Sequence, residues 1–311
     1  MSEVLEHYYF LHEIPELGFQ EVKTSAYIAG QLEQAGLKVT RNINNTTGIV
    51  AEIDSGVPGP VLALRADMDA LAMVEGGALD DVEMILGFHL RPLEECVVGQ
   101  AVPAVLYSAC STLEATIKDQ PAHEARPHLG VNTLDAAVQA VNAVNALHLS
   151  PGLNWSVKAT RFLCDAGVTN SVPDEARVLW DLRSQENAPM ELLKEQVTRA
   201  IVNSVAALGA TAQVRVLKEM PAAEIDDQAT AVIRAAIVEV LGEEELLPTK
   251  TTPGSEDFFY YPVKRPGVKA GFWGLGTNLT PGLHHPDMRF DLDSLEIGVQ
   301  IFKACVRKVL G

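Results

Sequence analysis

Acidic and histidine side chains gather at the points where predicted strands end. They follow two apolar runs, VLALRA and MILGF, and they recur in the turns PGSED and GLHHPD: Asp67, Asp69, His89, Glu256, Asp257, His284 and His285. Imidazole nitrogens and carboxylate oxygens are ligands that zinc takes in proteins. Open α/β sheets place their sites beyond the ends of strands. Two histidine-bearing loops and two acidic loops in such places therefore predict a metal site.

Each of these residues also has an ordinary interpretation. A single acid after a strand is commonly a cap, and a single histidine is commonly a surface residue with hydrogen-bond partners. No HExxH motif and no paired CxxC motif is present, so the spacing is only moderately specific for a metal. The combination of four loops, rather than any one residue, favours the metal site.

The elements that must position these residues begin with residues 1–103. The pattern predicts two helices, 2–14 and 21–36, ended by Pro15 and Gly36. Three strands follow, and the last two, PVLALRAD and VEMILGFHL, are nearly continuous apolar runs. Such runs are typical of central strands covered on both faces.

Residues 104–218 show a different order. Strands and helices alternate as STLEATIKD, TLDAAVQAVNAVNALHL, NWSVKATRFLCD, ARVLWDLRS, PMELLKEQVTRAIVNSVAALG and TAQVRVLKE. This is the β-α-β-β-α-β order of ferredoxin-like domains. Residues 219–311 supply a helix, the PGSED loop, a short strand near VKAGFWGLG and a closing helix. We therefore expect an α/β core in two parts, 1–103 and 219–311, with an inserted ferredoxin-like domain.

Composition limits the function classes. The chain has 311 residues, 47% of them hydrophobic, which is enough for two packed cores. Its 24 basic and 41 acidic residues give a net charge of −17 with no basic run, which argues against nucleic acid and anionic membranes. The four cysteines are scattered and the N-terminus lacks a basic signal-peptide region, so we expect reduced thiols and a cytoplasmic protein.

Seven stretches resemble the M20 family of metallopeptidases and amidohydrolases, in the branch of aminoacylases, hippurate hydrolases and indoleacetyl-amino-acid hydrolases. They are HEIPELGFQE, ALRADMDAL, GFHLRP, PAHEARPHLGVNTLDAA, GVTNSVPDEA, PGSEDFFYY and GLHHPDMRFD, in the family's order. The resemblance implies a two-domain hydrolase of N-acyl amino acids with two divalent ions, zinc or manganese. It also implies an inserted lid domain through which the protein forms a homodimer.

The resemblance suggests a role for particular residues. His89 and His284 correspond to metal ligands, and Asp67 to an acid that orients a ligand. His123 corresponds to the lid histidine that enters the partner's site and polarises the scissile carbonyl. The residues that correspond to substrate contacts are Asn170, Arg183 and Glu256. For Arg183, a surface salt bridge is an equally good interpretation.

One part of the family pattern is absent. In this branch ALRADMDAL is followed by HACGHDxH and later PAEE, which carry further metal ligands and the general base. Here DALAMVE passes directly to GGALDD, with the break near Glu75 and Gly76. Either the printed sequence omits a segment or the protein lacks it. We expect an omission, because apolar strands such as these need helices above them and a true deletion would leave one face of the sheet bare.

Three functions remain open at this point. The first is a metal-dependent amidohydrolase acting on N-acyl amino acids. The second is a dipeptidase of the same family. The third is a binding protein without catalysis, which applies if the segment is truly deleted.

Overall fold

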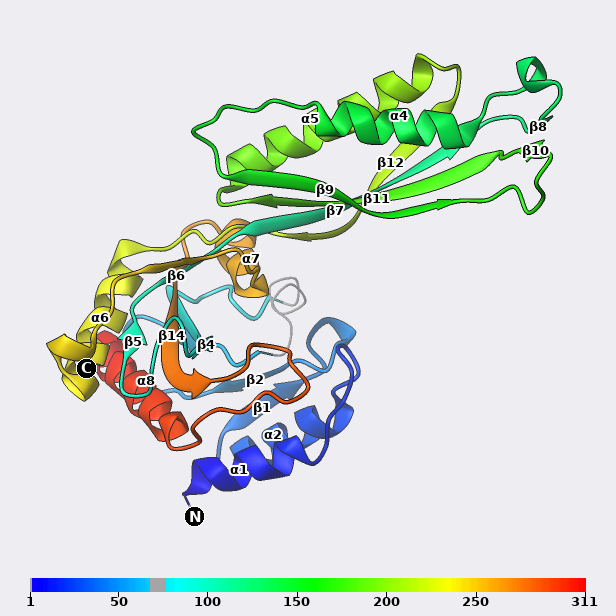
Figure 1. Cartoon of the computed structure of the whole chain (residues 1–311). Helices are drawn as coiled ribbons and strands as arrows, with labels where there is room; N and C mark the ends of the chain where they lie inside the picture. The colour runs from blue at the N-terminus through cyan, green and yellow to red at the C-terminus, as the bar shows by residue number, and fades with distance from the viewer. Residues whose placement is uncertain (1, 68–76) are drawn as a thin grey trace. The chain divides into compact units, whose positions relative to one another are not determined.

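The computed structural model describes residues 2–67 and 77–311, and the break near Glu75 and Gly76 lies outside them. The chain divides into two compact units (Figure 1). Unit 1 comprises residues 1–106, 224–251 and 257–311, and unit 2 comprises residues 107–223 and 252–256. The predicted α/β class is confirmed.

Unit 1 is built on a four-stranded sheet in the order β3-β4-β14-β5. Its elements are α1 (Glu3–His12), α2 (Val22–Gln34), β1 (Lys38–Arg41), η1 (Ile43–Asn45), β2 (Ile49–Glu52), β3 (Leu62–Leu64), β4 (Met84–Pro92), β5 (Ala101–Val102), α6 (Asp227–Leu241), η3 (Glu243–Glu245), η4 (Asp257–Phe259), α7 (Tyr260–Lys264), β14 (Lys269–Leu279) and α8 (Ser294–Leu310). Strands β3, β4 and β14 are parallel, and β5 is antiparallel to β14. A further two-stranded sheet consists of β6 (Val105–Tyr107) and β13 (Lys250–Thr252).

One face of this sheet carries the helices α6 and α8. Leu86 of β4 and Trp273 of β14 are buried there against Ile233 of α6 and Ile301 of α8. Helix α6 begins where the Asp226 carboxylate accepts hydrogen bonds from two backbone N–H groups of the first turn, both at 2.9 Å. Strand β14 has eleven residues and lies inside the sheet, whereas the sequence predicted only a short strand near this position.

The opposite face is covered by aromatic side chains. Phe258 packs on Phe272 of β14, with 4.8 Å between the ring centroids, and Phe259 lies beside the same ring at 5.9 Å. Ile85 of β4 is 2% exposed. The sequence argument held that a true deletion would leave one face bare, whereas Phe258 and Phe259 cover this face among the described residues. The choice between an omitted and a deleted segment stays a prediction.

The N-terminal part adds α1, α2 and the hairpin β1–β2. The hairpin turn uses Asn42, Asn44 and Asn45 in left-handed backbone conformations. Asparagine tolerates this conformation because its short side chain can hydrogen-bond locally. The sequence did not predict β1, since KVTR lacks a strong apolar alternation.

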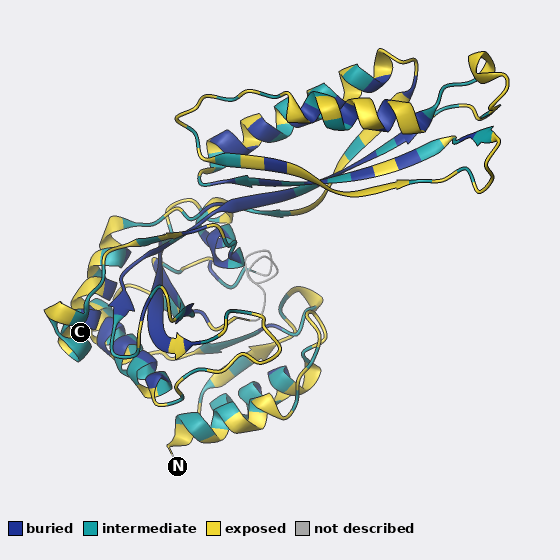
Figure 2. Ribbon diagram, in the orientation of Figure 1, coloured by how far each residue is buried: buried dark blue, intermediate teal, exposed yellow. Residues whose placement is uncertain are grey.

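Unit 2 consists of a four-stranded antiparallel sheet with helices on one side (Figures 1 and 2). Its elements are β7 (Ala109–Lys118), β8 (Ala122–His123), η2 (Pro127–Leu129), α4 (Thr133–Asn145), β9 (Trp155–Cys164), β10 (Ser171–Val172), β11 (Glu175–Ser184), α5 (Asn187–Ala206) and β12 (Thr211–Met220). The sheet order is β12-β7-β11-β9, and β8 pairs with β10. The order of the main elements is the predicted β-α-β-β-α-β.

The core of unit 2 lies between this sheet and its two helices, where Figure 2 shows the buried residues. Trp180 and Leu182 of β11 and Leu193 of α5 are fully buried. Asn132 caps α4 by accepting a hydrogen bond from the Leu134 N–H at 3.0 Å. The alternation of buried and less buried residues along β11 follows from a sheet with helices on one face only.

We expect Gly276→Ala to destabilise unit 1 strongly. A Cβ at Gly276 would lie 1.8 Å from the Val97 carbonyl oxygen and 2.6 Å from its carbon, so backbone must shift. The free energy of unfolding should fall by at least about 3 kcal/mol. Gly30→Ala is the control, because Gly30 is inside α2 with nothing within 4 Å, and it should stabilise by roughly 1 kcal/mol. Urea unfolding followed by circular dichroism measures both, and equal midpoints would contradict this packing.

Candidate functional site

The parallel strands of unit 1 bring three predicted site residues to one edge of the sheet. Asp67 follows β3, His89 lies near the end of β4, and His284 lies in the loop after β14. Because β3, β4 and β14 run in the same direction, their carboxyl ends meet at the same edge. Asp67 and His284 are both near enough to His89 to act on its pKa.

The ring of His89 is held by a hydrogen bond to the backbone of the next residue. Its Nδ1 donates a hydrogen bond to the Leu90 carbonyl oxygen at 2.8 Å, because a carbonyl can only accept. This leaves the lone pair on Nε2, the atom that can bind a metal or accept a proton. Burial lowers the pKa of His89, the Asp67 carboxylate acts in the opposite direction, and His284 adds to the lowering. The neutral, ligating form of the imidazole is therefore favoured.

Arg65 ties Asp67 to a second acidic loop. Its guanidinium pairs with the Asp67 carboxylate at 2.5 Å and also with Asp257 of the PGSED loop. Burial raises the pKa of Tyr261 to about 12, and Arg65 opposes part of this rise by donating a hydrogen bond to the phenol oxygen. One buried cation thus contacts two carboxylates and a tyrosine.

The loop after β14 carries the two adjacent histidines. His284 is exposed and has a left-handed backbone, with φ at 62°. The Nδ1 of His285 accepts a hydrogen bond from the Asp287 N–H at 3.1 Å, so this ring has a partner within its own loop. The assignment of His284 as a metal ligand stays a prediction.

The described residues do not complete a metal centre. Within residues 2–67 and 77–311, no group of three or more His, Cys, Asp or Glu side chains could hold a metal ion. His89 and His284 are two imidazoles, whereas a catalytic zinc takes three protein ligands. Asp67 is already paired with Arg65. The site as described therefore does not fit a dinuclear metal centre, and Asp69 and Glu75 fall outside the described residues.

The other predicted residues belong to unit 2, where they form two separate groups. In the first group, His123 of β8 pairs with Ser171 of β10, and the Glu124 N–H donates to the Asn170 carbonyl oxygen at 3.1 Å. The His123 ring is exposed, and its Nδ1 accepts a hydrogen bond from the Ala125 N–H at 3.1 Å. His123 and Asn170 are thus brought together by pairing of short strands that the sequence did not predict.

The second group contains Arg183 and the start of the PGSED loop. Arg183 forms a two-pronged ion pair with Asp181, at 2.7 and 3.1 Å, and donates to the Ser255 hydroxyl at 3.1 Å. The bond to Asp181 raises the pKa of Arg183. Glu256, next to Ser255, is 7% exposed. The salt bridge that the sequence left open for Arg183 is present, together with a contact to the predicted substrate loop.

These two groups lie at opposite ends of one sheet. Arg183 is paired with Cys110 at one end of β7, and Glu175, eight residues earlier on β11, is paired with Lys118 at the other end. At 3.4 Å per residue this separation is about 27 Å. His123 lies beyond the Lys118 end. His123 and Arg183 of one chain therefore cannot both touch one small substrate.

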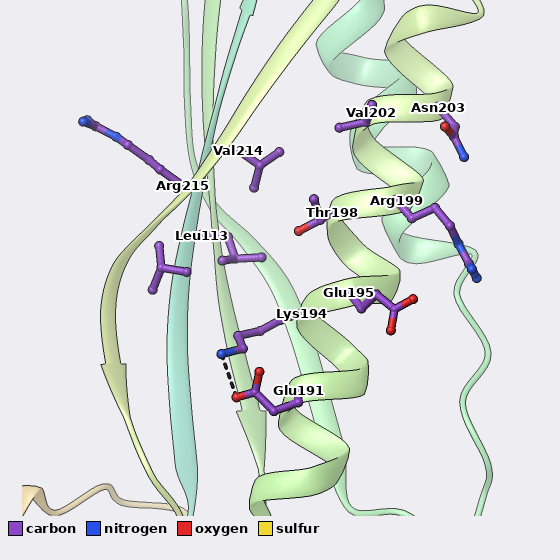
Figure 3. Close-up of a pocket in the computed structure, with 11 residues that line it drawn as sticks. Leu113, Glu191, Lys194, Glu195, Thr198, Arg199, Val202, Asn203, Val214 and Arg215 are labelled. Atoms are coloured by element: carbon purple, nitrogen blue, oxygen red, sulfur yellow. Dashed lines mark ion pairs between the residues drawn. The ribbon is translucent and has the colours of Figure 1, made fainter. Parts of the chain in front are cut away.

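A groove of about 590 Å³ also opens on unit 2, between α5 and the strands β7 and β12 (Figure 3). Leu113 and Val214 form its floor, and Lys194 and Glu191 form an ion pair at its side. Arg215 points away from α5 in this view. Because none of the predicted site residues lines the groove, it is not the predicted site.

Sequence reasoning missed two members of the unit 1 site, Arg65 and Tyr261, and it named Asp257 only as an acid of the PGSED turn. Arg65 was visible in ALRAD, and strand alternation puts residues two apart on one side. That signal could have paired Arg65 with Asp67. The contact with Asp257 joins residues 192 positions apart, and no local pattern predicts it.

The family model of peptidase family M20/M25/M40 matches residues 65–308. N-acetylcysteine deacetylase of Bacillus subtilis is 25% identical, over 94% of this chain and 93% of that protein. The IAA-amino acid hydrolase ILR1-like 6 of Arabidopsis thaliana is also 25% identical, over 97% of this chain and 79% of its own length. The first alignment extends over 360 positions although this chain has 311 residues, so it contains substantial gaps in this chain.

Among solved structures, a dinuclear metal binding peptidase of the M20 family from Bacillus subtilis superposes with a TM-score of 0.79. The match covers 98% of this chain and 97% of the other, at 23% identity. It shows that the fold is shared.

We expect the phenol of Tyr261 to stay protonated up to about pH 11, since its pKa lies near 12. A phenolate absorbance titration of Tyr261→Phe should then match the wild type over this range. A loss of amplitude below about pH 11 in Tyr261→Phe would show that Tyr261 is not in the buried place described. Circular dichroism at each pH checks that the fold persists.

Proposed function

The chain belongs to peptidase family M20/M25/M40, and we propose that it is a metal-dependent amidohydrolase acting on N-acyl amino acids or related amino-acid conjugates. The relatives named as a deacetylase of N-acetylcysteine and a hydrolase of IAA-amino acids support this substrate class. The observation that carries the proposal is the meeting of Asp67, His89 and His284 at the carboxyl edge of the parallel sheet. This is where α/β hydrolytic sites form.

The residues have distinct proposed roles. Asp67 orients His89, and His89 and His284 offer imidazole nitrogens to a divalent ion. His123 donates a hydrogen bond to the scissile carbonyl, where charge develops on oxygen. Asn170, Arg183 and Glu256 hold the substrate, the guanidinium of Arg183 being suited to a carboxylate. No described residue is assigned the task of taking the proton from the attacking water.

Zinc or manganese is the proposed metal, because the family and its dinuclear relative support divalent ions. The two imidazoles described here are too few for a closed catalytic shell. No step of the reaction is therefore assigned to a metal. The two ions per chain that the family resemblance implies need ligands beyond those of the described residues.

A homodimer is part of the proposal. We assign residues 104–218 the role of a lid and dimerisation domain between the catalytic parts 1–103 and 219–311. The separation of about 27 Å between the ends of the unit 2 sheet supports it. If Arg183 serves one active site, His123 of the same chain must serve another. The active unit is then a dimer with two composite sites.

The second candidate function is a binding protein without catalysis. It is favoured by the two-imidazole site and by the gaps in the alignment with the deacetylase. The lid and substrate residues would then bind an N-acyl amino acid without cleaving it. For either function we propose a cytoplasmic location, in keeping with four free thiols. No helix among the described residues is long and apolar enough to cross a membrane.

We expect the purified protein to release free amino acid from N-acetyl amino acids when zinc or manganese is supplied, and to lose this activity with a chelator. His284→Ala should lower kcat/KM by more than about 100-fold and reduce the bound metal. His148→Ala, an exposed histidine outside the site, is the matched control. Elemental analysis and a ninhydrin assay measure the two effects. Metal-free, inactive protein that still binds the substrate would favour the second candidate.

His123→Ala should preserve the fold and lower kcat by about 10²–10³-fold, because one donor to the developing oxyanion is lost. His128→Ala is the control, since this histidine lies in the same loop region. Mixing His123→Ala with His284→Ala, followed by unfolding and reassembly, should restore part of the activity. Heterodimers without recovered turnover would show that His123 does not act across subunits.

A further inference from the structure

We propose that Arg65 is a positioning residue that holds the two acid-bearing loops of unit 1, residues 65–67 and 257–261, in a single arrangement. The reaction whose site it positions rests on the function proposed above. The contacts of Arg65 belong to the fold and do not depend on that function.

The backbone of Arg65 is fixed to the central sheet. Arg65 follows the last residue of β3, and its N–H donates to the Leu86 carbonyl oxygen of β4 at 2.8 Å. This bond extends the parallel pairing of β3 and β4 by one residue. The side chain of Arg65 therefore starts from a position set by the strand that also carries His89.

The guanidinium is enclosed and serves three partners. The side chain of Arg65 is 6% exposed, and it pairs with Asp67, Asp257 and the Tyr261 hydroxyl. A planar guanidinium offers five N–H donors in a fixed fork, so it can hold several acceptors in defined directions. A lysine ammonium in the same place keeps the charge but cannot reproduce this fork.

Arg65 fixes the position of the Asp67 side chain, rather than the reverse. The side chain of Asp67 is 66% exposed, and an exposed carboxylate on a surface loop has little to fix its rotamer. Its partner Arg65 is buried, and Asp257, whose side chain is 23% exposed, anchors that partner from another segment. The position of Asp67 beside His89 therefore depends on a contact made 192 residues away in the sequence.

The contact also fastens the second loop. Asp257 begins η4, and the next residues, Phe258 and Phe259, cover one face of the sheet. Arg65 thus connects the acid beside His89 to the aromatic segment that closes the core. Replacing Arg65 should therefore loosen both loops. This double effect distinguishes Arg65 from an ordinary salt bridge.

Arg65→Lys tests the proposal with two measurements, amide hydrogen exchange and steady-state kinetics. We expect exchange in residues 61–67 and 253–264 to rise by about 10-fold or more while the rest of unit 1 is unchanged. We also expect kcat to fall by about 10–100-fold with KM altered by less than about 3-fold. Arg91→Lys is the matched control, because Arg91 is buried in the same sheet and pairs with Glu95 at 2.6 Å. It should loosen neither loop.

Three outcomes would overturn the proposal: unchanged exchange in residues 253–264, an even rise across unit 1, or the same two-loop effect in Arg91→Lys. If the wild type has no turnover, the proposed function fails, but the exchange data still decide the role of Arg65. If Arg65→Lys does not fold, Asp257→Asn takes its place. That variant should loosen residues 253–264 and lower kcat less, because Arg65 still holds Asp67, and equal exchange to the wild type would count against Arg65.

Discussion

Parallel pairing of β3, β4 and β14 is the constraint from which the site of unit 1 follows. Three strands that run in one direction deliver their carboxyl ends to one edge. Asp67, His89 and the loop with His284 meet there although they come from distant parts of the sequence. The sheet can keep this arrangement because both faces are covered, one by α6 and α8 and the other by the aromatic side chains of η4 and α7.

The charges within this site include the buried guanidinium of Arg65 as well as carboxylates. Arg65 pairs with both Asp67 and Asp257, so the charge of the carboxylate that acts on His89 is compensated by the protein itself. The imidazoles of His89 and His284 then remain as the described groups suited to a metal.

In unit 2, the length of the strands limits which residues can contact the same substrate. Its strands are ten residues long, and the candidate residues lie at their two ends. A small substrate cannot span such a sheet, so it cannot contact both His123 and Arg183 of one chain. The antiparallel pairing of β7 and β11 decides this, and the chemical nature of the residues does not.

The sequence by itself determined the α/β class, the β-α-β-β-α-β order of residues 109–220 and the position of Asp67 after a strand, whereas His89, predicted to follow its strand, lies inside β4. These features depend on local periodicity, on caps such as Asn132 and Asp226, and on motifs read within a few residues. The tertiary structure alone decided that β14 is a long internal strand, that Phe258 and Phe259 cover the second face, and that Arg65 contacts Asp257. Each of these rests on pairing or packing between segments far apart in the chain. Such contacts leave no periodic signal in either segment, because only the folded sheet brings the two together.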